Sequence, residues 1–169
     1  MQRFAVLPFV LSLVLAAPAA SSAELLCGGT YHIRLNNNTS ELETTHYRFK
    51  NFNARRTLTI TGITMYKHDG TAVSFDPSLI QSPLFNAVLG PHQSAGINLE
   101  DILGDPPENS AYGNMQIIVT WEADRGRGVL VPLQMNKGRI TKGWDNASKS
   151  PLETRARGSV RCESPTTND

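Results

Sequence analysis

The chain has 169 residues with a hydrophobic fraction of 40%, a charged fraction of 18% and a formal net charge of +1. A chain of this length suits one domain and can bury a core without a metal or a dense set of disulfides. No segment after the first 23 residues is long and apolar enough to span a membrane as a helix.

The N-terminal segment has the order of a secretory signal peptide. Arg3 precedes an apolar run over residues 4–17, and small residues follow. Ser21 and Ala23 are small at the −3 and −1 positions, so we expect cleavage after Ala23 and a mature chain that begins at Glu24. The apolar run is shorter than the roughly 20 residues of a spanning helix, which favours a signal over an anchor. The sequence therefore predicts a secreted or periplasmic protein.

The mature chain alternates apolar and polar residues with turn residues about every ten positions. This pattern is typical of an all-β fold and predicts a single antiparallel β-sandwich, immunoglobulin-like or similar, over residues 24–163, with a tail at 164–169. We expect at most one or two helical turns. The first clear strand covers residues 44–50.

The next predicted strand, residues 57–66, changes phase within itself. Its apolar alternation slips by one residue at Gly62, and such a slip turns side chains to the wrong face unless a bulge absorbs it. Glycine is common at bulges, so the sequence predicts a β-bulge at Thr61–Gly62. Asp69-Gly70 then predicts a tight hairpin turn, with a returning strand at residues 73–75.

The segment VLGPHQSAGINLEDIL, residues 88–103, contains His92-Gln93-Ser94-Ala95-Gly96, which is one residue away from the G-x-S-x-G elbow of serine hydrolases. That elbow needs a helix directly after the serine, whereas an alternating strand follows Ser94 here, so the pattern disfavours a nucleophile. Asn98 and Asp101 resemble a capping box. They predict one helical turn whose Ile102 and Leu103 plug the open end of the fold.

Two later segments predict a hairpin and a final strand. Residues 115–121 and 129–135 each carry one apolar face and flank the loop 124–128, and Pro132 marks the second as an edge strand. The final strand ends at Cys162, which is expected to point inward. An even number of cysteines in an oxidising compartment predicts a disulfide between Cys27 and Cys162, which on a chain-entropy model contributes about 5 kcal/mol.

Basic residues outnumber acidic ones after Asp124. Such a half can serve an anionic partner, and the alternative is an ordinary solvated surface. The partners expected are another envelope or secreted protein or an anionic surface, and no specific nucleic acid. The candidate anion-binding surface consists of five arginines: Arg125, Arg127, Arg155, Arg157 and Arg161.

The sequence predicts no cofactor and no catalytic or metal-binding residues. The four histidines (His32, His46, His68 and His92) are scattered without a metal-ligand spacing. The acidic loop, made of Glu100, Asp101, Asp105 and Glu108, lies beside Pro106-Pro107 and is typical of solvated surface. A hydrolase or metal protein using His92, Ser94 or this loop stays open as an alternative. Asn37, Asn38 and Asn146 are glycosylation acceptors only in a host that glycosylates.

Several short motifs carry a family resemblance: Ile63-Thr64-Met65-Tyr66 with Asp69-Gly70, then Leu89-Gly90-Pro91, then Asn98-Leu99 with Asp101-Ile102-Leu103, and a closing Arg161-Cys162. With these the chain resembles small secreted proteobacterial proteins, and residues 51–133 are similar in pattern to the sensory-rhodopsin-transducer-like β-sandwich. The resemblance implies a sandwich in a periplasmic or extracellular setting and transfers no catalytic residue. The expected function is that of an exported, non-enzymatic binding or assembly module, and the alternative is a self-associating structural surface protein.

Overall fold

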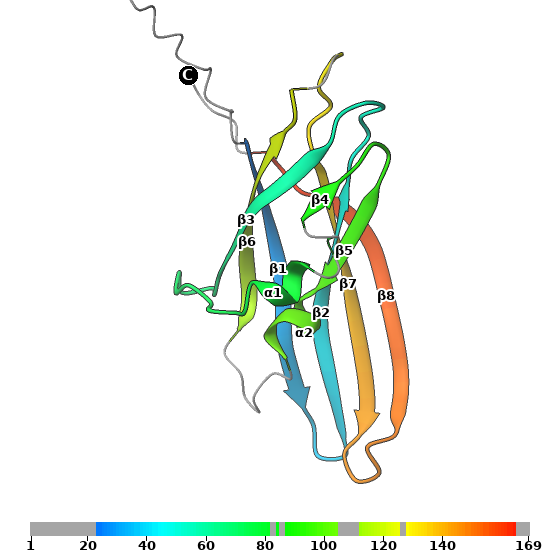
Figure 1. The fold of residues 1–169 in the computed structure, drawn as a ribbon. Coiled ribbons are helices and arrows are strands. Elements are labelled where there is room, and N and C mark those ends of the chain that lie inside the picture. Colours follow the sequence, from blue (N-terminus) through cyan, green and yellow to red (C-terminus); the bar gives the residue numbers. More distant parts are fainter. Residues whose placement is uncertain (1–22, 82–83, 85–86, 105–111, 126–127, 165–169) are drawn as a thin grey trace, which may run out of the picture.

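The computed structural model describes residues 23–81, 84, 87–104, 112–125 and 128–164. These residues form an eight-stranded antiparallel sheet and two short helices, so the predicted all-β class is confirmed (Figure 1). The elements are β1 (Ala23–Leu35), β2 (Thr39–Lys50), β3 (Leu58–Tyr66), α1 (Ser78–Gln81), β4 (Val88–Leu89), β5 (Ser94–Asn98), α2 (Leu99–Leu103), β6 (Gly113–Ala123), β7 (Gln134–Asp145) and β8 (Pro151–Arg161).

The strands follow the hydrogen-bonded order β4-β3-β6-β1-β2-β7-β8, with β5 paired to β2. All of these strands belong to one sheet, which is curled, so a sandwich of two separate sheets is not confirmed. The curl encloses a core of apolar side chains from β1, β2, β3, β6 and β7, among them Leu25, Phe49, Met65, Ile117 and Met135.

Strand β2 changes its partner halfway along one edge. β7 pairs with β2 along its whole length, so β1 and β5 share the opposite edge. Residues 40–44 pair with β1, and residues 46–50 pair with β5. Beyond this point β1 separates from β2, and Leu26 forms an isolated bridge with Glu163 after β8. The curl thereby leaves a gap in the ladder beside β1, between residues 27 and 30.

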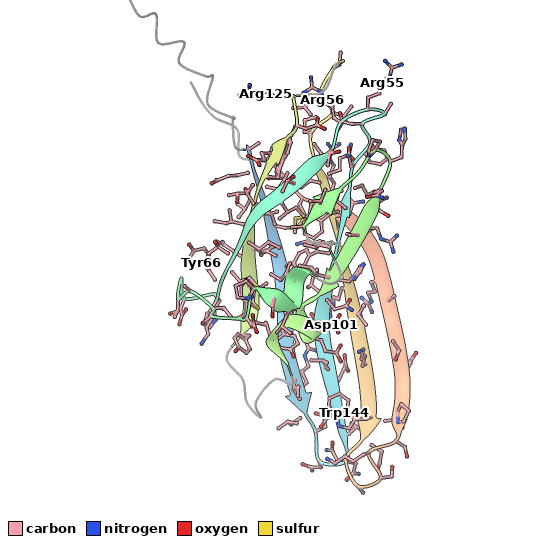
Figure 2. All side chains as sticks on the ribbon, viewed as in Figure 1. Arg55, Arg56, Tyr66, Asp101, Arg125 and Trp144 are labelled. Carbon is pink, nitrogen blue, oxygen red and sulfur yellow. A yellow bond between two sulfur atoms is a disulfide. The ribbon has the colours of Figure 1, made fainter. Side chains whose placement is uncertain are left out.

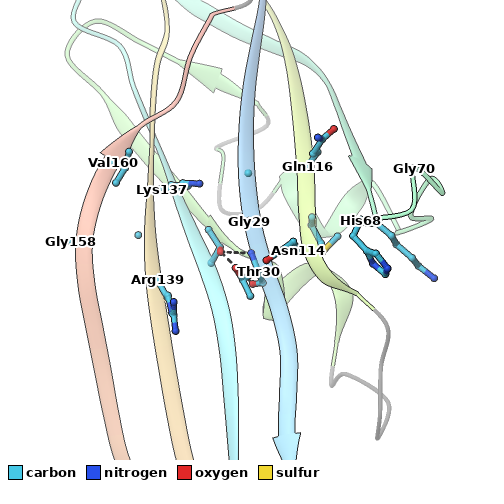
Figure 3. Close-up of a pocket in the computed structure, with 15 residues that line it drawn as sticks. Gly29, Thr30, His68, Gly70, Asn114, Gln116, Lys137, Arg139, Gly158 and Val160 are labelled. Carbon is cyan, nitrogen blue, oxygen red and sulfur yellow. Dashed lines mark hydrogen bonds between the residues drawn. The ribbon is translucent and has the colours of Figure 1, made fainter.

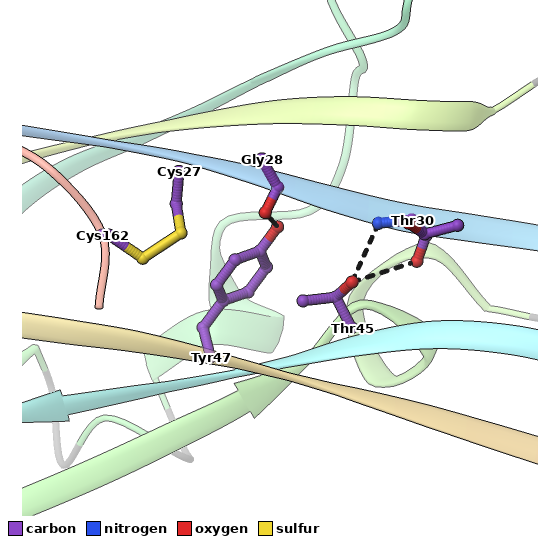
Figure 4. The surroundings of a disulfide bond; sticks show 6 residues. All are labelled: Cys27, Gly28, Thr30, Thr45, Tyr47 and Cys162. Atoms are coloured by element: carbon purple, nitrogen blue, oxygen red, sulfur yellow. Dashed lines mark hydrogen bonds between the residues drawn. A yellow bond between two sulfur atoms is a disulfide. The ribbon is translucent and has the colours of Figure 1, made fainter. Parts of the chain in front are cut away.

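The predicted disulfide is confirmed and lies at this gap. Cys27 and Cys162 are bonded, with a sequence separation of 135 residues, and both are buried (Figure 4). The bridge ties the first strand to the segment that follows the last strand. It therefore holds the two ends of the described chain together on one side of the curl.

Two local predictions are confirmed. The register between β3 and β6 shifts between Ile60 and Gly62, where the bulge was expected. Helix α2 follows Asn98, and of the two residues expected in the apolar plug Ile102 is buried and Leu103 is partly buried, with Leu99 buried beside them. The Asn98 side chain does not cap the helix backbone, however. Its amide donates to Asp101 at 2.7 Å and its oxygen lies 2.8 Å from Nδ1 of His46.

The predicted hairpin of residues 115–121 with 129–135 is wrong. β6 pairs with β1 and β3, whereas β7 pairs with β2 and β8. Pro132 precedes β7, which is an interior strand, and the strand at the end of the ladder is β8. Alternation showed which faces were apolar, and it carried no information on which strands meet. The strand expected at residues 73–75 is reduced to a bridge between Tyr66 and Ala72.

Within the described part of the chain, no helix has the length and apolar character needed to cross a membrane.

Candidate functional site

A groove of about 670 Å³ crosses the outer face of the sheet at the gap beside β1 (Figure 3). β1 and β6 form one wall, with Thr30, Asn114 and Gln116 in it. β7 and β8 form the other wall, from which Lys137 and Arg139 project. The turn between β3 and residue 72 closes one end with Lys67 and His68. The groove thus draws on strands far apart in the sequence, which only the curl brings together.

The floor of the groove is made by glycines and one threonine. Gly28 and Gly29 lie in β1 where it leaves β2, and Thr45 lies opposite in β2. The Thr45 hydroxyl accepts a hydrogen bond from the Thr30 amide at 2.8 Å and donates to the Thr30 carbonyl at 3.3 Å (Figure 4). This side chain replaces the backbone ladder at the point where the two strands part.

Tyr47 fills the gap from beneath. Its side chain is fully buried, and its hydroxyl donates to the Gly28 carbonyl at 3.3 Å (Figure 4). A Cβ atom on Gly29 would collide with this hydroxyl, so the close approach requires glycine at that position. Burial raises the pKa of the Tyr47 phenol well above its ordinary value, which keeps the hydroxyl a neutral donor.

The charged side chains that line the groove are all basic. The residues that line it include Lys67, Lys137 and Arg139 and no aspartate or glutamate. The charge of Arg139 is balanced by Glu43, because the guanidinium lies 2.5 Å from the buried Glu43 carboxylate. Lys137 forms no ion pair with any residue that the structure describes. A cation without a counter-charge over a polar floor can bind an anion.

Lys137 reaches across the groove. Its ammonium lies 3.2 Å from the position that a Cβ atom on Gly28 would occupy, so the side chain extends from β7 to β1. Lys67, at the end of the groove, stands over the ring of Tyr112 at 5.3 Å from its centroid. Lys137 therefore enters the groove from the β7 wall, and Lys67 lies at its closed end.

The structure separates the arginines of the predicted anion-binding surface. Arg155 and Arg157 lie on the exposed strand β8 beside a small hollow of about 150 Å³ that Glu41 and Glu153 also line. Arg155 pairs with Glu153 at 2.5 Å, and this hydrogen bond lowers the pKa of the Glu153 carboxyl.

The other members of that set lie elsewhere. Arg161 lies beside Cys162 at the end of β8, and Arg125 follows β6 at the start of the β6–β7 connection. Arg127 lies outside the described residues. The groove is thus a different site from the one that the sequence predicted.

The other candidate residues occupy ordinary positions. His92 lies in a turn with a φ of 59°, and Ser94 is exposed at the start of β5. Glu100 pairs with Lys142 at 2.5 Å. Asp105 and Glu108 lie outside the described residues, and the described part of the chain contains no group of three or more potential metal ligands.

Sequence reasoning missed Lys137, Thr45 and the Gly28-Gly29 pair. A signal for them exists, because a glycine inside a strand often marks a close approach of a ligand or of another backbone. Gly28-Gly29, Gly138 and Gly158 all lie within strands that border the groove. What the sequence did not reveal is that these strands lie next to each other.

No protein-family model matches the chain, and a search of the curated proteins finds no significant match. The resemblance to the sensory-rhodopsin-transducer-like sandwich therefore stays an expectation. Fold and groove together define an all-β, disulfide-linked domain with a cationic groove on its outer face.

Proposed function

We propose that this chain is an exported, non-enzymatic binding module that holds an anionic group of its ligand in the groove beside β1. One observation carries the proposal: the lining of the groove includes Lys67 and Lys137, neither of which forms an ion pair with a described residue, and no acidic side chain. The disulfide and the leader-like N-terminus support a secreted or periplasmic setting.

The geometry favours an anion over an apolar ligand. The lining residues are mainly glycines, polar side chains and cations, with Met115 and Val160 as the apolar members. Thr30, Asn114 and Gln116 provide hydrogen-bonding groups along the β1–β6 wall. Carboxylate, phosphate and sulfate groups share the chemistry that these donors recognise. The groove is open along the sheet, which suits a group carried by a larger ligand.

The test is retention on heparin-agarose, measured as the salt concentration at elution. Lys137→Glu is expected to lower that concentration strongly, because it reverses the one cation that spans the groove without a counter-charge. Lys149→Glu, in the exposed turn before β8, is the matched control, since it makes the same change of charge away from the groove.

A third variant separates the two cationic surfaces. Arg157→Glu reverses a charge that lines the hollow on β8 and not the groove, opposite Arg139, which lines both. If Lys137→Glu and the Lys149 control shift elution equally, the groove is not the site. If Arg157→Glu has the larger effect, the anion binds along β8, as the sequence first suggested.

A further inference from the structure

A second surface lies at the end of the molecule where the loops of residues 51–57 and 128–132 meet. Three of its apolar side chains face solvent: Val129 is 92% exposed, Phe52 47% and Leu130 36%. Val129 and the 53–56 segment line a shared hollow of about 270 Å³, so the two loops lie against each other. We call this surface the loop end. It shares no residue with the groove.

Two buried asparagines hold the loop end in place. Asn51 is 2% exposed, and its amide nitrogen lies within 3.0 Å of three carbonyl oxygens, those of Arg56, Leu89 and Gly90. Its side-chain oxygen accepts from the backbone and side-chain nitrogens of Asn53. A buried and fully bonded amide of this kind fixes the loops that it joins.

Asn53 extends the network to the second loop. It is 3% exposed, its amide donates to the Val131 carbonyl at 2.7 Å, and its oxygen accepts from the Val131 amide at 2.8 Å. Phe52 lies between the two asparagines in the sequence. With both neighbours anchored inward, its ring is held outward, and the exposure of Phe52 is built into the loop.

Cationic side chains lie at the same end of the molecule as these apolar side chains. Arg55, Arg56 and Arg125 gather at this end (Figure 2). Arg56 also joins the loops, because its guanidinium donates to the Gly128 carbonyl at 2.9 Å. Among the described residues of 51–57, 124–125 and 128–132, one residue is acidic, Asp124. Its carboxylate accepts a hydrogen bond from the Thr57 amide at 2.9 Å. The loop end therefore carries a net positive charge.

We propose that the loop end docks onto the surface of an anionic phospholipid membrane. Phe52, Val129 and Leu130 would enter the headgroup region, while the arginines face the lipid phosphates. Apolar side chains displayed beside cations are the combination that binds such surfaces, since both area burial and charge attraction contribute. Protein interfaces also combine apolar side chains with arginine, and an acidic protein partner predicts no binding to lipid vesicles, so the experiment below separates the two occupants.

The experiment is co-sedimentation of residues 24–169 with vesicles of phosphatidylcholine mixed with phosphatidylglycerol, and with vesicles of phosphatidylcholine alone. We expect binding to the anionic vesicles that weakens with added salt, and little binding to the neutral ones. Val129→Asp removes apolar contact, and Arg55→Glu reverses one charge. Each is expected to weaken binding by about tenfold.

Leu152→Asp is the matched control, because Leu152 is 58% exposed on β8, away from the loop end. All three substitutions fall on exposed side chains, and circular dichroism verifies that each variant is folded. The proposal is overturned if the wild-type chain does not bind anionic vesicles, or if the Leu152 variant is weakened as much as the others. Loss of binding in Lys137→Glu alone would also overturn it, because the membrane would then contact the groove.

Discussion

Gly29 is the residue that sets how closely β1 can pass over Tyr47. A Cβ atom there would meet the Tyr47 hydroxyl, with the ring carbon that bears it 3.2 Å away. The Tyr47 side chain cannot retreat, because it is fully buried in the core. The floor of the groove therefore has room for glycine at this position and not for a larger residue.

We expect Gly29→Ala to destabilise the fold by about 1–3 kcal/mol through overpacking. Tyr47→Phe in the same chain should recover part of that loss, because it removes the atom that the new methyl group meets. Urea denaturation of the single and double variants measures the coupling. Gly158→Ala is the control, since nothing lies within 4 Å of its Cβ position. An equal cost of Gly29→Ala with and without the hydroxyl would contradict this account.

At the scale of the element, β2 is the strand that organises the fold. It pairs with β7 on one edge and passes from β1 to β5 on the other. Where the partner changes, the Thr45 hydroxyl accepts from the Thr30 amide and donates to the Thr30 carbonyl, in place of a backbone partner. The sequence showed a β-rich segment here and gave no sign that one edge serves two strands.

Thr45→Val keeps the shape and β-propensity of the side chain and removes the hydroxyl. The Thr30 amide then loses its acceptor in a part-buried setting, so we expect a loss of about 1 kcal/mol in the free energy of unfolding. Thr141→Val, on β7, is the matched control, and its hydroxyl has no hydrogen-bond partner among the described residues. Both variants are compared by thermal and urea unfolding. A Thr45 effect no larger than that of the control would show that the ladder closes without it.

For the whole molecule, the disulfide and the Leu26–Glu163 bridge close the curl. Strand β8 is exposed along its full length and reaches the core through Cys162, which follows it. The C-terminal end of the ladder is therefore attached to β1 by one covalent bond and a short backbone contact.

Replacing Cys27 and Cys162 by serine should lower the free energy of unfolding by about 5 kcal/mol, because the loop of 135 residues regains its freedom in the unfolded chain. Denaturation under reducing and oxidising conditions measures the difference. The double variant is expected not to respond to reductant, which makes it the internal control. A wild-type midpoint that reductant leaves unchanged would contradict the role assigned to the bridge.

The sequence by itself determined the local features: the all-β class, the bulge at Gly62, the buried turn of α2 and the cysteine pair. Each follows from residues near one another or from an even cysteine count, where periodicity and turn chemistry suffice. The tertiary structure decided the strand order, the curl and the groove. Lys137 and Gly28 are more than a hundred positions apart, and alternation records which face a residue takes without recording which strand lies beside it.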